Sequence, residues 1–410
     1  MPSPAADAVI RRARLAASGI AGSLQNLSRQ GRWSSIWTAA AIRASGLTMT
    51  PRPSAAVRQD ASTRTDWLRT RAALLLAPIL ALAYPFLLEG FTASVSAVLS
   101  GSGGFDAWLG IAATLMLAFA VPILALLAAM SLAAVDLPTV AQRRALHVAL
   151  VAVAVPPGFV FLGVVLTMLH SPIPDTWIWV AAWAAAGVSV ALADNKSPTK
   201  PTPAAVAGWP RVAHGISALC IVVLFLALHI GNHLFFVEGQ AGYMVIMKLF
   251  RHVYREAVVQ PIVVALFLFQ VASGLYLAIG RVSAPMDRFR TFQVASGVFL
   301  AFYILGHMDS VFIFARAYQG IDTDWGFATG APAGLVKDAW NIRLVPHYGL
   351  AIFFVLAHLF SGLRVILLKH GVRKALADRT MIGGSVAAAA ANILIMLGMC
   401  GVRVSFVLPS

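Results

Sequence analysis

The sequence predicts an all-α integral membrane protein, a polytopic transmembrane helical bundle of about nine spans. Of its 410 residues, 59% are hydrophobic and only 11% are charged, and the mean hydropathy is +0.80. A soluble domain of this size needs far more charge to cover its surface. The apolar residues also form runs of about 20, which is enough to cross about 30 Å of hydrocarbon as a helix.

Each predicted span is one such apolar run. The fourth is short, and Pro156-Pro157 should kink the third, because proline removes a helical hydrogen bond. We predict spans at 72–90, 107–133, 147–169, 176–193, 212–236, 257–280, 291–315, 346–368 and 382–405.

Composition divides the chain into five parts. Residues 1–68 are a basic N-terminal tail, and 69–194 are a four-helix membrane part to which no sequence feature assigns a role. The Pro- and Lys-containing stretch 195–210 is a linker, 211–375 form a second four-helix bundle, and 376–410 hold a C-terminal transmembrane helix.

The tail is rich in Arg and Ser and poor in acidic residues. It has no apolar region typical of a secretory signal. Two interpretations stay open: a mitochondrial transit peptide, or a cytosolic tail with a short surface helix around Trp33 to Ile42.

The formal net charge of +15 comes from basic residues that lie mainly between the spans. This is the pattern of loops held on the inner side of a membrane, so we expect no nucleic-acid partner. The loop 92–106 has no Lys or Arg. The alternation places the N-terminus inside and the C-terminus outside, in a bacterial or mitochondrial inner membrane.

Two predicted outer loops carry more positive charge than this rule expects. Segment 237–256 holds Lys248, Arg251 and Arg255, and segment 316–345 holds three further basic residues, Arg316, Lys337 and Arg343. We expect both segments to form structured caps lying on the bundle.

Several cofactor classes are excluded by what the sequence lacks. Its two cysteines, Cys220 and Cys400, lie in separate apolar stretches, so they support no disulfide framework, iron–sulfur cluster or covalent c-type haem. No Rossmann fingerprint or P-loop is present. Oxidation of a soluble substrate would therefore need partner chains.

The second part of the chain repeats short motifs. Arg211-x-x-His214-x-x-Ser217 opens the fifth span, and Arg290-x-x-Gln293-x-x-Ser296 opens the seventh. Gln270-Val-Ala-Ser-Gly-Leu275 closes the sixth, and His358-Leu-Phe-Ser-Gly-Leu363 closes the eighth. Two copies of a helix pair predict a bundle with approximate two-fold symmetry, and bundle cores hold cofactors.

Two histidines of this repeat are predicted to lie at the same depth. His229 follows Arg211 by 18 residues, and His307 follows Arg290 by 17. At about 1.5 Å per residue, both imidazoles reach nearly the same level, toward the outer face. Two histidines on facing helices are what a bis-imidazole haem site requires, and only non-covalent haem is open to this chain.

Other helical positions extend the pattern. Gln293, Ser296 and His307 fall on one face of their helix, and His347 shares a face with His358. His233, one turn beyond His229, is an alternative ligand. The alternative interpretation is that the histidines bind no cofactor and hydrogen-bond between helices. For the four histidines at span ends we favour interfacial anchoring; these are His147, His170, His252 and His370.

The stretch from about 205 to 375 resembles the cytochrome b membrane anchor subunit of succinate dehydrogenases and fumarate reductases. The most specific match is the last one, which is similar to the segment around a haem-ligating histidine there. The matching segments are Arg211-Val-Ala-His214, His229-Ile-Gly-Asn232, Gln293-Val-Ala-Ser-Gly297, His307 and His358-x-x-x-Gly362-Leu-Arg364.

The resemblance implies haem b and quinone as the partners of a cytochrome b-like bundle. His229 and His307 would be the iron ligands of one haem. His358 would pair with position 270, but Gln270 is not an ordinary axial ligand, so the second haem is either absent or held by His358 alone. The implied quinone candidates are Arg211, His214, Ser217, Arg290, Gln293 and Ser296.

Two functions remain in view. The first is a b-type cytochrome that transfers electrons between a redox partner and membrane quinone, with partner subunits of a respiratory-type complex. The second is a non-enzymatic membrane protein with structural histidines, either a small-solute or lipid transporter or an assembly subunit. The repeat lacks the glycine–proline interruptions of a common transporter, which favours the cytochrome.

Overall fold

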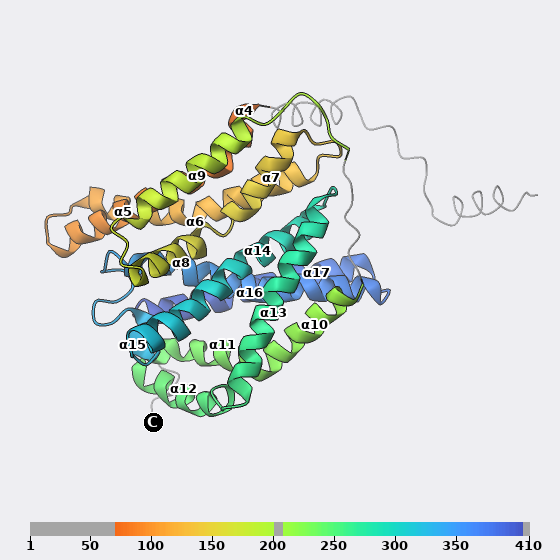
Figure 1. Cartoon of the computed structure of the whole chain (residues 1–410). Coiled ribbons are helices and arrows are strands. Elements are labelled where there is room, and N and C mark those ends of the chain that lie inside the picture. The colour runs from red at the N-terminus through yellow and green to blue at the C-terminus, as the bar shows by residue number, and fades with distance from the viewer. Residues whose placement is uncertain (1–69, 201–207, 405–410) are drawn as a thin grey trace, which may run out of the picture. The chain divides into compact units, whose positions relative to one another are not determined.

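The computed structural model describes residues 70–200 and 208–404 (Figure 1). The predicted tail 1–68, the middle of the predicted linker and the last six residues lie outside the described residues. Asp66–Ser410 form one compact unit. Within the described ranges the elements are helices, with no strand, so the predicted all-α class is confirmed.

The first part of the chain forms six helices. Thr139 caps one of them through a capping box with Gln142, in which each side chain bonds the other's backbone amide. The helices are α4 (Arg71–Leu74), α5 (Leu76–Leu99), α6 (Phe105–Ala133), α7 (Val140–Ala152), α8 (Val155–Met168) and α9 (Asp175–Ala191).

The second part forms long helices joined by short caps. The α-helices of its apolar spans are α10 (Trp209–Ile221), α11 (Ala227–Leu234), α13 (Val259–Val282), α14 (Arg288–Met308), α16 (Leu344–Lys369) and α17 (Lys374–Met399). The π-helical segments η1 (Val222–Leu226) and η3 (Asp309–Tyr318) continue α10 and α14. The caps are η2 (Phe235–Glu238), α12 (Gln240–Tyr254), α15 (Trp325–Thr329) and η4 (Asn341–Arg343).

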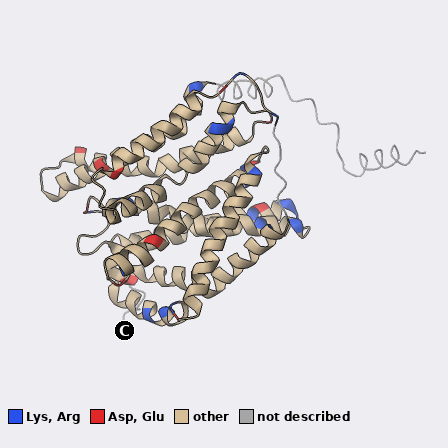
Figure 2. Ribbon diagram, in the orientation of Figure 1, with Lys and Arg blue, Asp and Glu red and all other residues tan. Residues whose placement is uncertain are grey.

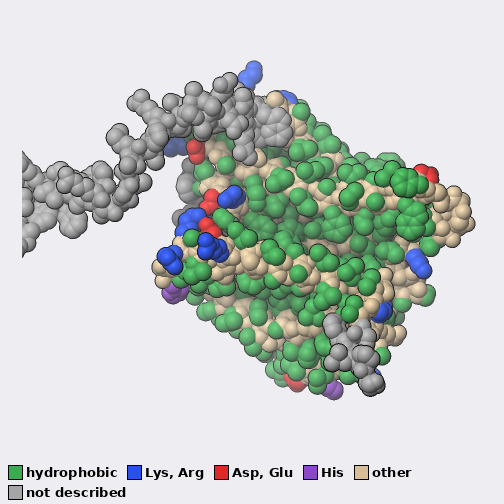
Figure 3. Space-filling view, turned by 180° about the vertical axis from the view of Figure 1, so that it is seen from behind, with side chains coloured by type: hydrophobic (Ala, Val, Ile, Leu, Met, Phe, Trp, Pro, Cys, Tyr) green, Lys and Arg blue, Asp and Glu red, His purple; other side chains and the backbone are tan. Residues whose placement is uncertain are grey.

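Seven helical segments of the described ranges are long and apolar enough to cross a membrane, and a bent pair, α7 and α8, makes up to eight. Only 11% to 39% of the residues in each apolar window are buried, so most of them reach the surface at least in part, and Figure 3 shows one such apolar face. The charged residues gather toward helix ends and connections in Figure 2. These are the properties of lipid-embedded helices, and the chain is an integral membrane protein.

The span count of nine stays a prediction, since α9 has only 17 residues. The expected kink in the third span is confirmed. That span is split into α7 and α8, which meet at 68°, and Pro156 and Pro157 stand in the first turn of α8. The expected caps are also confirmed, because α12 and α15 pack against each other and α12 packs against η2 and α11.

The helices that carry the candidate residues lie side by side. α10 packs on α13, α13 on α14, and α14 on α16, while α17 covers α16. α14 also packs on α6, α7 and α8, so it is a wall shared by the two parts of the chain. Gly398 lets α17 approach the cap η2, because a Cβ there would lie 2.6 Å from the Phe236 carbonyl carbon.

One ion pair joins the two parts of the chain where α9 and α16 begin. Arg343 of η4 donates to Asp175 of α9, and the two side chains are 13% and 18% exposed. The guanidinium also lies 4.8 Å from the ring centre of Phe159 and 4.9 Å from that of Trp340. The pair therefore ties α9 and α8 to the start of α16.

We expect Arg343→Gln to lower the free energy of unfolding by about 3 kcal/mol, because it leaves the carboxylate of Asp175 unpaired in a half-buried site. Thermal unfolding in detergent measures this as a lower Tm. The control is Lys374→Gln, whose side chain is 72% exposed and whose partner Asp378 keeps Arg364; its effect should stay below about 1 kcal/mol. Equal Tm values for the two variants would contradict the prediction.

Candidate functional site

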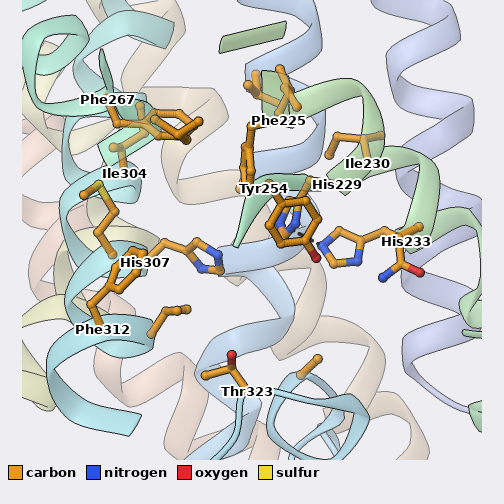
Figure 4. Close-up of a pocket in the computed structure, with 18 of the residues that line it drawn as sticks. Phe225, His229, Ile230, His233, Tyr254, Phe267, Ile304, His307, Phe312 and Thr323 are labelled. Atoms are coloured by element: carbon orange, nitrogen blue, oxygen red, sulfur yellow. Dashed lines mark hydrogen bonds between the residues drawn. The ribbon is translucent and has the colours of Figure 1, made fainter. Parts of the chain in front are cut away.

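Two histidines from two different spans of the second part face each other. His229 lies in α11, three residues beyond the π segment η1, and His307 lies in the last turn of α14, directly before the π segment η3. Their ring centroids are 6.2 Å apart. Figure 4 shows His307 reaching toward His229 and His233 from the opposite wall. Both spans thus depart from α-helical geometry beside the histidine, as spans often do at functional sites.

The rings of both histidines are held by aromatic neighbours. Phe225 stacks on His229 with centroids 4.6 Å apart, and Tyr303 stacks on His307 at 5.4 Å with an interplanar angle of 10°. Each neighbour precedes its histidine by four residues, so it lies one helical turn away on the same face. The histidine rings are therefore oriented by their own helices.

His229 also has a hydrogen-bond partner. Its Nε2 lies 3.1 Å from Nε2 of His233 (dashed line in Figure 4). One of these two nitrogens carries the proton and the other accepts it. A metal ion at Nε2 of His229 would replace this bond, since the same lone pair cannot serve both. His233 therefore lies in the site predicted from the sequence, as a neighbour of the proposed ligand.

The histidines line a cavity of about 210 Å³. Its wall is mostly apolar, with residues from α13, α14, α16 and α17, among them Val263, Phe267, Leu300, Ile304, Ala351, Val355 and Met399. Besides the histidines, polar groups reach the cavity from α12 and its end, where Arg251, Tyr254 and Arg255 line it, and from the loop after η3, where Thr323 lines it. A largely apolar pocket with a few polar groups is the usual form of a cofactor site.

The structure places His358 elsewhere, between α14 and α16. Its Nδ1 lies 2.8 Å from the Ser296 hydroxyl, and a Cβ on Gly297 would lie 3.3 Å from its Cε1. His347, predicted to share its face, is 2% exposed and lies against Tyr303 at 4.7 Å. His358 is thus docked onto the backbone of α14.

His214 of α10 is docked in the same way onto α13. Its Nδ1 lies 2.8 Å from the Ser273 hydroxyl, and a Cβ on Gly274 would lie 3.3 Å from its Cε1. The receiving helices carry the identical segment Gln-Val-Ala-Ser-Gly, at 270–274 in α13 and at 293–297 in α14. The same five residues therefore hold a histidine twice.

The two glutamines of these segments are engaged by other side chains. Ser217 donates to Oε1 of Gln270 at 2.6 Å, and Arg290 donates to Oε1 of Gln293 at 3.1 Å. Arg211 is exposed at the start of α10. Five of the six quinone candidates thus lie in two groups, one on α10 against α13 and one on α14 beside α16.

Sequence reasoning missed three features of the site. The stacking of Phe225 and Tyr303 follows from a simple four-residue spacing. The identity of segments 270–274 and 293–297 is visible in the sequence. The meeting of Arg251, Arg255 and Arg316 at one cavity has no local signal, because it depends on how the caps fold.

Among the described residues, no group of three or more His, Cys, Asp or Glu side chains is placed to hold a metal ion. No family model matches the chain, and no curated protein and no solved structure matches it.

Proposed function

We propose that this chain is a membrane b-type cytochrome that passes electrons between a redox partner and membrane quinone. The observation that carries the proposal is the facing pair His229 and His307. Their ring centroids are 6.2 Å apart, and both rings line a largely apolar cavity between membrane-spanning helices. Haem would supply the one-electron chemistry, and the chain would supply the ligands and a dry pocket.

The spacing of the two rings suits one iron between them. An imidazole nitrogen lies about 2 Å from a bound metal, so two rings on opposite sides of one metal have centroids about 6 Å apart. Site chemistry agrees, because imidazole suits iron and two axial ligands suffice when a macrocycle supplies the other four. Phe225 and Tyr303 would keep the two rings aimed at the metal.

The polar groups near the inner end are proposed to receive the quinone. A quinone accepts hydrogen bonds at two carbonyl oxygens, and the quinol donates from two hydroxyls. Arg211 and Arg290 are donors. His214 and Ser217 can act in either direction. Gln293 and Ser296 are the other two candidates on α14, beside Arg290. Partner subunits would provide the donor or acceptor of a respiratory-type complex in a bacterial or mitochondrial inner membrane.

A second function is favoured by one observation. His214 and His358 are both hydrogen-bonded to serines of the neighbouring helix, which is how structural histidines behave in a membrane. If His229 and His307 were also structural, the chain would be a transporter or an assembly subunit. The spectrum described next separates the two functions.

We expect the detergent-purified protein to show a b-type α-band in a dithionite-reduced minus oxidised spectrum. His229→Ala and His307→Ala should each abolish it, because each leaves a single axial ligand. His170 and His370 lie at helix ends, so His170→Ala and His370→Ala should leave the band intact. A colourless preparation from haem-replete cells would refute the cytochrome and favour the second function.

A second haem is expected to depend on position 270. Gln270→His places an imidazole where Gln270 now bonds Ser217, and the ratio of haem to protein should rise from about one toward two. Adding His358→Ala to this variant should remove the gain. An unchanged ratio in the folded Gln270→His protein would show that side chains have closed the second site.

Orientation is testable with reporter fusions. We expect the N-terminus and residues 195–200 on the inner side, and the loop 100–104 and the C-terminus on the outer side, because the basic residues of the described loops alternate in this way. A linker reporter on the side opposite to the N-terminus would contradict this orientation and the shared depth of His229 and His307.

A further inference from the structure

The outer rim of the histidine cavity concentrates positive charge. Arg251 from α12, Arg255 just beyond it and Arg316 from η3 all line the cavity that holds His229 and His307. The side chains of Arg251 and Arg255 are only 15% and 25% exposed. In the orientation predicted from the basic loops, these arginines lie at the outer end of the bundle, where the distribution of charge in membrane proteins disfavours them. Their position therefore calls for a reason other than topology.

The counter-charge on the rim is smaller than the positive charge. Asp322 bonds both Arg251, at 3.0 Å, and Arg255, at 3.1 Å, and it is 60% exposed. Arg316 donates to the neutral amide of Gln260 at 3.1 Å and has no ion pair among the described residues. Three cations thus face one carboxylate, and the rim carries two positive charges in excess.

The nearest other carboxylate in the sequence does not correct the excess. Glu256 follows Arg255 directly, but its side chain is exposed and does not line the cavity, and its carboxylate accepts from the backbone amides of Val258 and Val259. A net charge of two beside an apolar cavity is costly unless a ligand of opposite charge joins it. The cavity therefore fits a ligand that brings two negative charges to this end.

Resting on the proposed function, we infer that Arg251, Arg255 and Arg316 bind the two propionate carboxylates of the haem. Two carboxylates cancel the two excess charges. Arginine suits this role because its planar fork donates two parallel hydrogen bonds to one carboxylate. The ring of Tyr254, between Arg251 and Arg255 in the sequence, lies 6.4 Å from that of His229, so the rim and the metal-binding rings are within reach of one macrocycle. The carboxylate edge of the haem thus points to the outer face.

The test compares haem b with its dimethyl ester, in which both carboxylates are blocked. Full-length protein from haem-limited cells is titrated with each compound in detergent, and binding is followed by the absorption of the complex. We expect the wild-type protein to prefer the free acid at least about tenfold, because charge-assisted hydrogen bonds are the strong ones.

Variants of the rim should change this preference in opposite directions. Arg316→Gln combined with Arg251→Gln should bring it close to one, whereas Asp322→Asn, which removes the competing carboxylate, should raise it. Lys248→Gln is the matched control, since Lys248 is an exposed cation of α12 outside the cavity, and it should keep the wild-type preference.

The outcomes separate the two proposals. Wild-type protein that binds neither compound would refute the proposed function itself. Wild-type protein that binds both compounds equally through His229 and His307 would keep the cytochrome and overturn the arginine site. This comparison needs no variant, so it decides the inference even if the arginine variants fail to fold.

Discussion

Polar side chains inside hydrocarbon have no water to bond, and the structure answers this constraint in two ways. At one level, His214 bonds Ser273 and His358 bonds Ser296. These bonds join α10 to α13 and α14 to α16, so they hold the bundle together. At another level, His229 bonds His233 on its own helix, and the rings line a cavity. The same residue type thus closes the bundle at one level and leaves it open at another.

The first part of the chain packs against the helices that carry these histidines. A Cβ on Gly306 would lie 3.0 Å from the Cβ of Phe161 in α8, so α14 lies close against that helix. Gly349 of α16 lies close to Phe119 of α6 in the same way, since a Cβ added there would lie 3.1 Å from the ring. Because His307 follows Gly306, contact with α8 fixes the wall from which His307 projects. Residues 70–191 therefore have at least a supporting role.

The predictable parts of this structure follow from simple periodicities. The hydrocarbon thickness sets span length, and a fixed rise per residue sets the shared level of His229 and His307. The rest depends on tertiary contacts. The caps bring Arg251 and Arg316 to one cavity from segments about 65 residues apart. The break between α7 and α8 was expected at the prolines, but its 68° angle depends on packing. The docking of His214 and His358 needed knowledge of which helices are neighbours.

The π segment η1 changes how the span of His229 should be aligned with the span of His307. A π turn holds one residue more than an α turn, and η1 lies between Arg211 and His229, whereas η3 begins only after His307. This accounts for the offset of 18 residues in one span and 17 in the other. Aligning these two spans by Arg211 and Arg290 therefore requires a one-residue gap within Val222–Leu226. Without that gap, His307 is matched to Leu228, and the equivalence of the two histidines disappears from the alignment.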